Sequence, residues 1–155
     1  MSCCLAASSA SSGLLVVDAT GHIAGRLSSK VAKLLLEGQK VVIVNADAAV
    51  LSGRKRMLVQ EFHKRLEIGG AVHPKYGPFH PRRPDRILSR MVRGMLPRTK
   101  PKGEAAMKRL RVYAGVPIEY GPAQKSTFVD AKATRRLTFY ASLGDVAKEI
   151  GWKGE

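Results

Sequence analysis

The chain has 155 residues, of which 45% are apolar and 25% are charged, and its 27 basic and 12 acidic residues give it a net charge of +15. This length supports one hydrophobic core, and the apolar content argues against a disordered basic tail of the histone or protamine kind. The only two cysteines, Cys3 and Cys4, are adjacent, so the sequence offers neither a disulfide framework nor Cys-x-x-Cys spacing for zinc.

Residues 1–13 form a Ser- and Ala-rich leader, which we expect to be flexible, and residues 14–155 are expected to form a single domain. The leader has no basic segment followed by a sustained apolar stretch, which argues against a secretory signal, and it lacks the Arg typical of mitochondrial transit peptides. No apolar run approaches the about 20 residues that span a bilayer. We therefore expect a cytoplasmic protein with no membrane association.

The first half of the domain has the pattern of a strand–helix–strand unit. Residues 14–20 are a short apolar run, and residues 40–45 are apolar on both faces, as strands of parallel sheets are. Between them, Gly21 to Glu37 places apolar residues on one arc with a period near 3.6. This pattern predicts an α/β protein, specifically a three-layer α/β/α domain with a small parallel sheet.

The second half adds further expected elements. A helix from Arg54 to about Leu66 should face inward through Leu58, Val59, Phe62 and Leu66. A loop rich in Gly, Pro and His spans residues 69–83, and a helix spans Pro84 to Leu96, ended by Pro97. We further expect a helix over residues 102–110, strands over 111–114 and 136–140, and a last helix over 143–152. Residues 54–111 thus form a basic loop–helix excursion from the α/β domain.

The positive charge is concentrated in this excursion. Seventeen Lys and Arg but only four acidic residues lie between Arg54 and Arg111, so thirteen of the fifteen net charges fall in well under half of the chain. So local an excess is typical of proteins that neutralise the phosphates of a nucleic acid.

The helix expected from Pro84 to Leu96 carries an arginine stripe. Arg86, Arg90 and Arg93 lie within about 60° of one another at 100° per residue. The opposite half is apolar, with Ile87, Leu88, Met91, Val92, Met95 and Leu96. No acid lies at i±3 or i±4 to pair with the stripe, so we favour contact with a polyanion over a solvated charged face.

The loop over residues 73–84 interleaves basic residues with aromatic side chains. This mixture suits RNA, because cations bind its phosphates and rings stack on its exposed nucleobases. The alternative is that Tyr76 and Phe79 pack on the domain, and both can hold. A third basic cluster begins the helix at Arg54, where bound phosphate would offset its conflict with the helix dipole. The predicted binding residues are Arg54, Lys55, Arg56, Lys75, Tyr76, Phe79, His80, Arg82, Arg83, Arg86, Arg90, Arg93, Arg98, Lys100 and Lys102.

A rival site lies at the start of the first helix. The run Thr20 to Gly25 follows a strand and opens a helix, and Asp47 follows the next strand, which is the layout of a dinucleotide-binding unit. The spacing lacks the middle glycine that lets the backbone approach a pyrophosphate. We prefer the interpretation that Gly21 and Gly25 allow tight helix–sheet packing, and we expect no cofactor, no metal site at His73 and His80, and no catalytic residue.

Several segments resemble a known family. The run Gly77-Pro-Phe-His80, the residues Arg82, Pro84, Arg86 and Ile87, and the run Val92-Arg-Gly-Met-Leu-Pro97 are similar to the signature of the universal large-subunit ribosomal protein L-thirteen family, in its archaeal and eukaryotic branch. The resemblance covers residues 15–153. It implies an α/β/α domain without enzymatic activity that binds large-subunit rRNA beside neighbouring ribosomal proteins.

Two alternatives of other kinds remain open at this point. One is a small dinucleotide-binding domain related to oxidoreductases, and the other is a free regulatory RNA-binding protein.

Overall fold

A computed structural model describes residues 13–70, 73–134 and 139–154. Its centre is a parallel four-stranded sheet of β1 (Leu14–Asp18), β2 (Lys40–Val44), β4 (Leu110–Val112) and β5 (Lys125–Ser126), in the order β4-β2-β1-β5. The register pairs Leu15 with Val41 and Val17 with Ile43. Parallel neighbours need a crossover connection, and α1 (Ala24–Leu36) makes it between β1 and β2. The predicted strand–helix–strand unit and the α/β class are confirmed.

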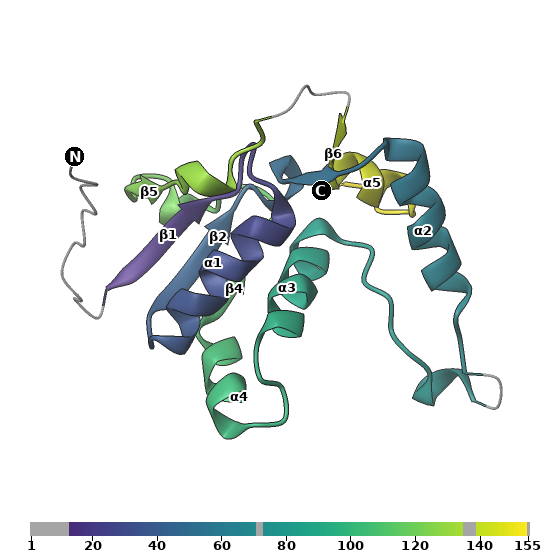
Figure 1. The fold of residues 1–155 in the computed structure, drawn as a ribbon, viewed down its shortest axis with the longest axis horizontal. Helices are drawn as coiled ribbons and strands as arrows, with labels where there is room; N and C mark the ends of the chain where they lie inside the picture. The colour runs from purple at the N-terminus through teal and green to yellow at the C-terminus, as the bar shows by residue number, and fades with distance from the viewer. Residues whose placement is uncertain (1–12, 71–72, 135–138, 155) are drawn as a thin grey trace.

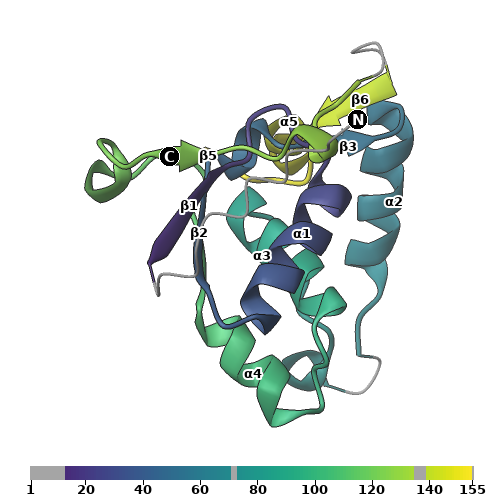
Figure 2. The ribbon, with the colours of Figure 1, turned by 60° about the vertical axis from the view of Figure 1, so that its left-hand side comes forward.

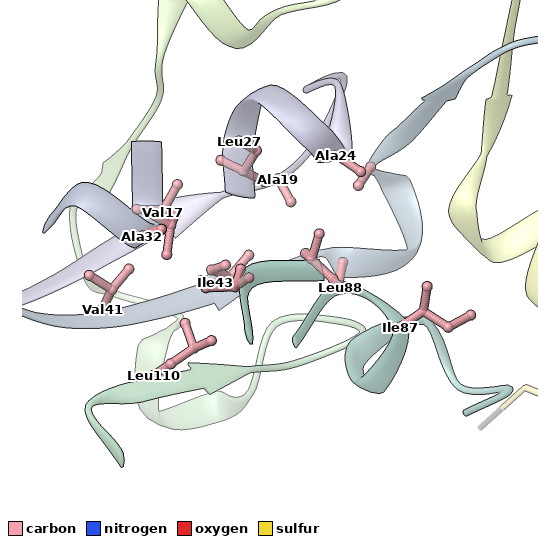
Figure 3. Packing of buried hydrophobic residues seen from close by; sticks show 14 of the residues in the cluster. Val17, Ala19, Ala24, Leu27, Ala32, Val41, Ile43, Ile87, Leu88 and Leu110 are labelled. Atoms are coloured by element: carbon pink, nitrogen blue, oxygen red, sulfur yellow. The ribbon is translucent and has the colours of Figure 1, made fainter. Parts of the chain in front are cut away.

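Three helices cover one face of this sheet. They are α1, α3 (Pro84–Met95) and α4 (Pro101–Lys108), which lie on the same side of β1 and β2 in Figure 2. The core lies between them and the strands: Leu27, Ile43 and Leu88 are fully buried, and the labelled side chains of Figure 3 interlock around them. Burial of these apolar side chains is the main favourable term that holds the helical layer on the sheet.

The opposite face of the sheet is covered differently. Val16, Val42 and Val44 pack against Tyr113, Tyr120 and Ala123, and the two tyrosine ring centroids are 5.8 Å apart. The segment that supplies these partners contains the short 3-10 helix η3 (Ile118–Tyr120). The predicted α/β/α arrangement has a second helical layer on this face. Among the described residues, this short segment takes its place.

A second, smaller sheet joins distant parts of the chain. β3 (Val50–Ser52) pairs antiparallel with β6 (Tyr140–Ser142), and the last helix α5 (Leu143–Glu149) follows β6 directly. The 3-10 helix η1 (Ala46–Ala48) packs against α5, where Gly144 allows the close approach: a Cβ there would lie 3.2 Å from the Asp47 carbonyl oxygen.

Of the predicted basic excursion, α2 (Lys55–Glu67) and the loop after it lie outside the layer that covers the sheet, whereas α3 and α4 belong to that layer. Figure 1 shows α2 on the side of the molecule away from β1, joined to α3 by a long loop that holds the 3-10 turn η2 (Pro74–Tyr76). No residue of α2 is buried. Its predicted inward face does make the contact, because Leu58, Val59, Phe62 and Leu66 pack, partly buried, against Ala141, Val146 and Ile150.

Several predicted boundaries were wrong. The first helix starts at Ala24 and not at Gly21, whose φ of +67° is outside the helical region. The helix expected over residues 102–110 ends at Lys108, and Leu110 begins β4. The last helix ends at Glu149, before Gly151 with a φ of +105°. The strand expected over residues 136–140 falls largely on 135–138, outside the described residues, while Tyr140 begins β6.

Candidate nucleic-acid interface

Helix α3 separates an apolar face from a basic one, as predicted. Ile87, Leu88 and Val92 are buried against the sheet layer, whereas Arg86 and Arg90 are exposed and Arg93 is half-buried. Met91 is only partly buried, and Met95, which the helical period places on the apolar half, is 45% exposed. The helix begins with Pro84 at its first turn, and the Asp85 carboxylate accepts a hydrogen bond of 2.8 Å from the Arg86 backbone N–H.

The loop before α3 presents its aromatic side chains to solvent. Tyr76 is 84% and Phe79 is 71% exposed, so the alternative that these two rings pack on the domain was wrong. The Tyr76 ring lies instead beside His73, with centroids 5.3 Å apart. Exposed aromatic rings within a basic loop are surfaces on which RNA bases stack.

Two hydrogen bonds hold this loop in place. The Arg90 guanidinium donates to the Phe79 carbonyl oxygen. On the other side, His80 Nε2 lies 2.9 Å from the Ile68 carbonyl oxygen, to which it donates as an N–H, at the end of α2. The loop is therefore braced to both helices that flank it, and Arg90 and His80 have structural contacts as well as predicted binding roles.

The loop and α3 together enclose a basic groove, defined here as the α3 groove. It has a volume of about 550 Å³ and is lined by Phe79, His80, Pro81, Arg86, Ser89, Arg90, Arg93 and Met107. Five of the predicted binding residues thus come together, three guanidiniums from the helix and a phenyl and an imidazole ring from the loop. This combination of cations and rings suits a phosphodiester backbone with neighbouring bases.

Other predicted residues lie outside the α3 groove. Arg54 is the N-cap residue of α2, and Lys55 Nζ forms an ion pair of 3.2 Å with Glu149, which joins α2 to α5. Arg83 lies 3.4 Å from Asp85, and Lys100 is the N-cap residue of α4. Four more of the predicted residues have exposed side chains: Arg56, Lys75, Arg82 and Arg98. Lys102 borders a hollow between α1 and α4.

Two of the basic side chains between Arg54 and Arg111 make contacts within the fold that the sequence pattern did not reveal. Arg109 donates to the Leu35 carbonyl oxygen at 3.1 Å, at the C-terminus of α1, and Arg111 donates to the Leu110 carbonyl oxygen at 3.2 Å. Cations at helix C-termini interact favourably with the last carbonyls. A basic residue directly before or within a strand is the one sequence signal that could have marked them.

Sequence reasoning also missed two neighbours of the groove. Arg65 lies over the Phe62 ring, with 5.3 Å from guanidinium carbon to ring centroid, and Met107 of α4 lines the α3 groove. The spacing of Phe62 and Arg65, one helical turn apart, was the available signal for the first. Met107 carried no signal, because only the packing of α4 beside α3 brings it there.

The rival site at Thr20 to Gly25 does not form a phosphate cradle. Its backbone N–H groups already donate within the chain: Gly21 to the Ala48 carbonyl at 3.2 Å, His22 to that of Ala19 at 3.0 Å and Ile23 to that of Ala131 at 2.8 Å. A pyrophosphate needs such groups free. The prediction of tight packing at Gly25 was also wrong, because a Cβ there would meet nothing within 4 Å, and Gly21 is required by its positive φ.

His22 and Asp18 organise this turn instead. The His22 ring is fully buried, with Nδ1 3.0 Å from the Thr20 carbonyl oxygen and with Nε2 accepting the Phe128 N–H at 3.1 Å. Asp18 accepts hydrogen bonds from Thr20 and from the Asn45 side chain. Burial alone would raise the pKa of Asp18, but these hydrogen bonds and the nearby Lys125 outweigh it, so the pKa lies below its ordinary value.

In the described parts of the chain, no group of three or more His, Cys, Asp or Glu side chains is arranged to hold a metal ion. No helix in those parts is long and apolar enough to cross a bilayer.

The fold and the groove define a class of protein: an α/β domain whose basic, ring-bordered surface is suited to a polyanion. Comparison with known proteins narrows the class. The family described as Ribosomal protein L13 matches residues 13–119, and the chain belongs to this family.

Its relatives come from archaea and eukaryotes. The large ribosomal subunit protein uL13 of Methanococcoides burtonii is 46% identical over 141 residues, covering 90% of this chain and 99% of the relative. The protein of the same name from Aeropyrum pernix is also 46% identical, covering 90% and 91%, and that from Tetrahymena thermophila is 43% identical, covering 90% and 72%. The resemblance drawn from the sequence motifs is confirmed.

Proposed function

We propose that the protein is a structural constituent of the large ribosomal subunit that binds and stabilises large-subunit rRNA during assembly and translation. The observation that carries the proposal is the α3 groove, in which three arginines meet the exposed rings of the loop. Family membership supports it, because the relatives are named as large-subunit proteins.

The proposed mechanism is charge neutralisation combined with shape. Arg86, Arg90 and Arg93 lie on an α-helix whose apolar side is fixed in the core, so their charges are held on a rigid element. Each phosphate neutralised by such a group releases condensed counterions, which drives association. The remaining predicted residues on α2, the loop and α4 extend the contact to further rRNA segments.

The proposal includes partners and place. We expect the protein to lie among neighbouring large-subunit proteins on the cytosolic ribosome, to act on no small-molecule substrate, and to have no enzymatic activity. The apolar face of α2 packs against Ala141, Val146 and Ile150, and the ion pair between Lys55 and Glu149 uses no residue that lines the groove.

Sucrose-gradient fractionation of lysate from cells that express the tagged full chain tests the proposal. We expect the protein to sediment with large ribosomal subunits and with complete ribosomes, and to move to the top of the gradient when Arg86, Arg90 and Arg93 are all replaced by Ala. A protein found only in RNA-bound fractions lighter than the subunit would indicate a free regulatory RNA-binding protein instead. A nicotinamide or flavin absorbance spectrum of the natively purified protein would indicate the rejected dinucleotide site.

A further inference from the structure

A second hollow lies behind the α3 groove. This cavity, called here the α2–α3 cavity, has a volume of about 270 Å³ and is lined by Phe62, Arg65, Leu66, His80, Pro81, Ile87, Arg90, Met91 and Ile150. Pockets for drug-sized ligands span about 300–1,000 Å³, so this one is suited to a single planar ring. It lies beside the partly buried face through which α2 packs against the domain.

The interior and the mouth of the cavity differ in chemistry. Leu66, Ile87 and Ile150 supply aliphatic walls, Phe62 an aromatic ring and Met91 a polarisable thioether. Two guanidiniums, Arg65 and Arg90, complete the lining. Arg65 lies over the Phe62 ring and is 59% exposed, and its Glu61 neighbour is 3.9 Å away, too far and too exposed to neutralise it firmly.

The cavity and the α3 groove share a wall. His80, Pro81 and Arg90 line both hollows, and Arg90 is held in position by its hydrogen bond to the Phe79 carbonyl. A phosphate on Arg90 in the groove therefore lies beside the cavity mouth. Because His80 Nε2 donates to Ile68, Nδ1 of the neutral ring is an acceptor, which suits the exocyclic amine of a base.

We propose that the α2–α3 cavity receives one unstacked nucleobase of the RNA whose phosphates lie in the α3 groove. The inference rests on the proposed function and adds the mode of binding to it. A ring that is apolar on its faces and tethered to a phosphate matches an apolar cavity with cations at its mouth. A peptide would have to combine an apolar anchor with acidic residues, and the extended basic surface around the mouth favours the polyanion.

The test uses the full chain and two fluorescent single-stranded probes of equal length and charge, oligoadenylate and the corresponding abasic ribose-phosphate oligomer. Leu66→Trp fills the cavity from α2, and Met57→Trp is the matched control, because Met57 is 58% exposed on the same helix and does not line the cavity. Thermal melting establishes that each variant folds. Phe62→Leu, which removes the stacking ring, is the second variant.

We expect the wild type and Met57→Trp to bind oligoadenylate about five- to a hundredfold more tightly than the abasic oligomer, the range that one stacked base contributes. Leu66→Trp should lower this preference by about fivefold or more, to what the exposed Tyr76 and Phe79 rings still contribute. Its affinity for the abasic oligomer and its salt dependence should stay unchanged, and Phe62→Leu should lower the preference in the same direction. Retention of the full preference by both variants would overturn the inference.

Three further outcomes separate the inference from the function on which it rests. Equal, strongly salt-dependent binding of both probes by the wild type would overturn the cavity inference and leave the proposed function standing. No binding of either probe would contradict both. Loss of affinity in Leu66→Trp for an acidic peptide with one Phe, with oligoadenylate binding intact, would overturn the inference in favour of a protein partner.

Discussion

The guanidinium of Arg90 serves the loop and the groove at once, which the periodicity of α3 alone does not reveal. One of its N–H groups donates to the Phe79 carbonyl, and the side chain remains exposed between two hollows. An exposed side chain of this kind contributes little to the free energy of unfolding, because water replaces its contacts.

Arg90→Ala should therefore change RNA binding and leave stability nearly unchanged. We expect the melting temperature of the free protein to stay within about 2 °C of the wild-type value. The slope of log K against log salt should become less negative by about one. Arg26→Ala is the matched control, since Arg26 is exposed on α1 away from the groove. Unfolding of the Arg90 variant would show that the stripe is an internal structural element and not a binding surface.

Asp18 is a residue whose contribution depends on pH. Its folded-state pKa is depressed, so its stabilising effect is present above the unfolded value, near 3.8, and is lost as the pH falls through the folded-state pKa. Asp18→Asn should lower the melting temperature at pH 6, and the gap to the wild type should shrink below about pH 4. Thermal melts across this range measure the gap; a gap that stays constant down to pH 2 would contradict the assignment.

At the scale of elements, α3 joins core and surface in one helix, and this is why its two faces can be tested separately. Its buried residues anchor it under α1 and on the sheet, whereas Met95 near its end leaves the core although the 3.6-residue period placed it inward. The period shows which side of a helix faces the core. It does not show how far along that side the neighbouring elements extend.

Leu88→Ala should lower the free energy of unfolding by about 2–5 kcal/mol, because a fully buried leucine leaves a cavity. Met95→Ala on the same helix should change it by less than about 0.5 kcal/mol. Urea denaturation of both variants measures the difference. Equal losses for the two variants would mean that the helix is seated differently on the core.

Two glycines in helices should respond to Ala with opposite signs. In α4, a Cβ at Gly103 would lie 2.1 Å from the Pro97 carbonyl oxygen, so Gly103→Ala must displace the turn between α3 and α4 and lower the melting temperature. In α1, Gly25→Ala meets nothing and should stabilise the protein by up to about 1 kcal/mol, because Ala is the better helix former. Differential scanning calorimetry reports both; stabilisation by Gly103→Ala would contradict the close contact.

For the whole molecule, the distribution of charge decides how it associates. Part of the charge of the seventeen Lys and Arg between Arg54 and Arg111 is used within the fold: Arg90, Arg109 and Arg111 donate to backbone carbonyls, and Lys55, Arg65 and Arg83 form ion pairs with acidic side chains. The other Lys and Arg of this region are distributed over α2, the loop, α3, α4 and the turn between α3 and α4.

The salt dependence of RNA binding should show this breadth. If about six to ten Lys and Arg side chains neutralise phosphates, log K should fall against log salt with a slope of about −5 to −9 for duplex-like RNA. Filter binding of a structured large-subunit rRNA fragment at several salt concentrations measures it. A slope near −1 would contradict a broad basic interface.

Local pattern by itself determined the α/β class, the parallel pairing of the first two long strands, the arginine stripe of α3 and the family. These follow from the order and period of apolar residues and from motifs, all of which are local in sequence. The short strands β3, β5 and β6 carried too few residues for a period, and each forms only because a distant partner pairs with it. The α3 groove was predictable as a set of residues but not as a hollow.

Only the tertiary structure decided which basic side chains border the groove and which are used within the fold alone. Arg109 and Arg90 both donate to a backbone carbonyl, yet Arg109 lies at the C-terminus of α1 and Arg90 borders the groove. The glycines show the same division, because Gly25 lies in open space whereas Gly103 and Gly144 are in close contact. Such differences depend on which atoms of distant segments come within a few ångströms, and the order of residues along the chain does not contain those distances.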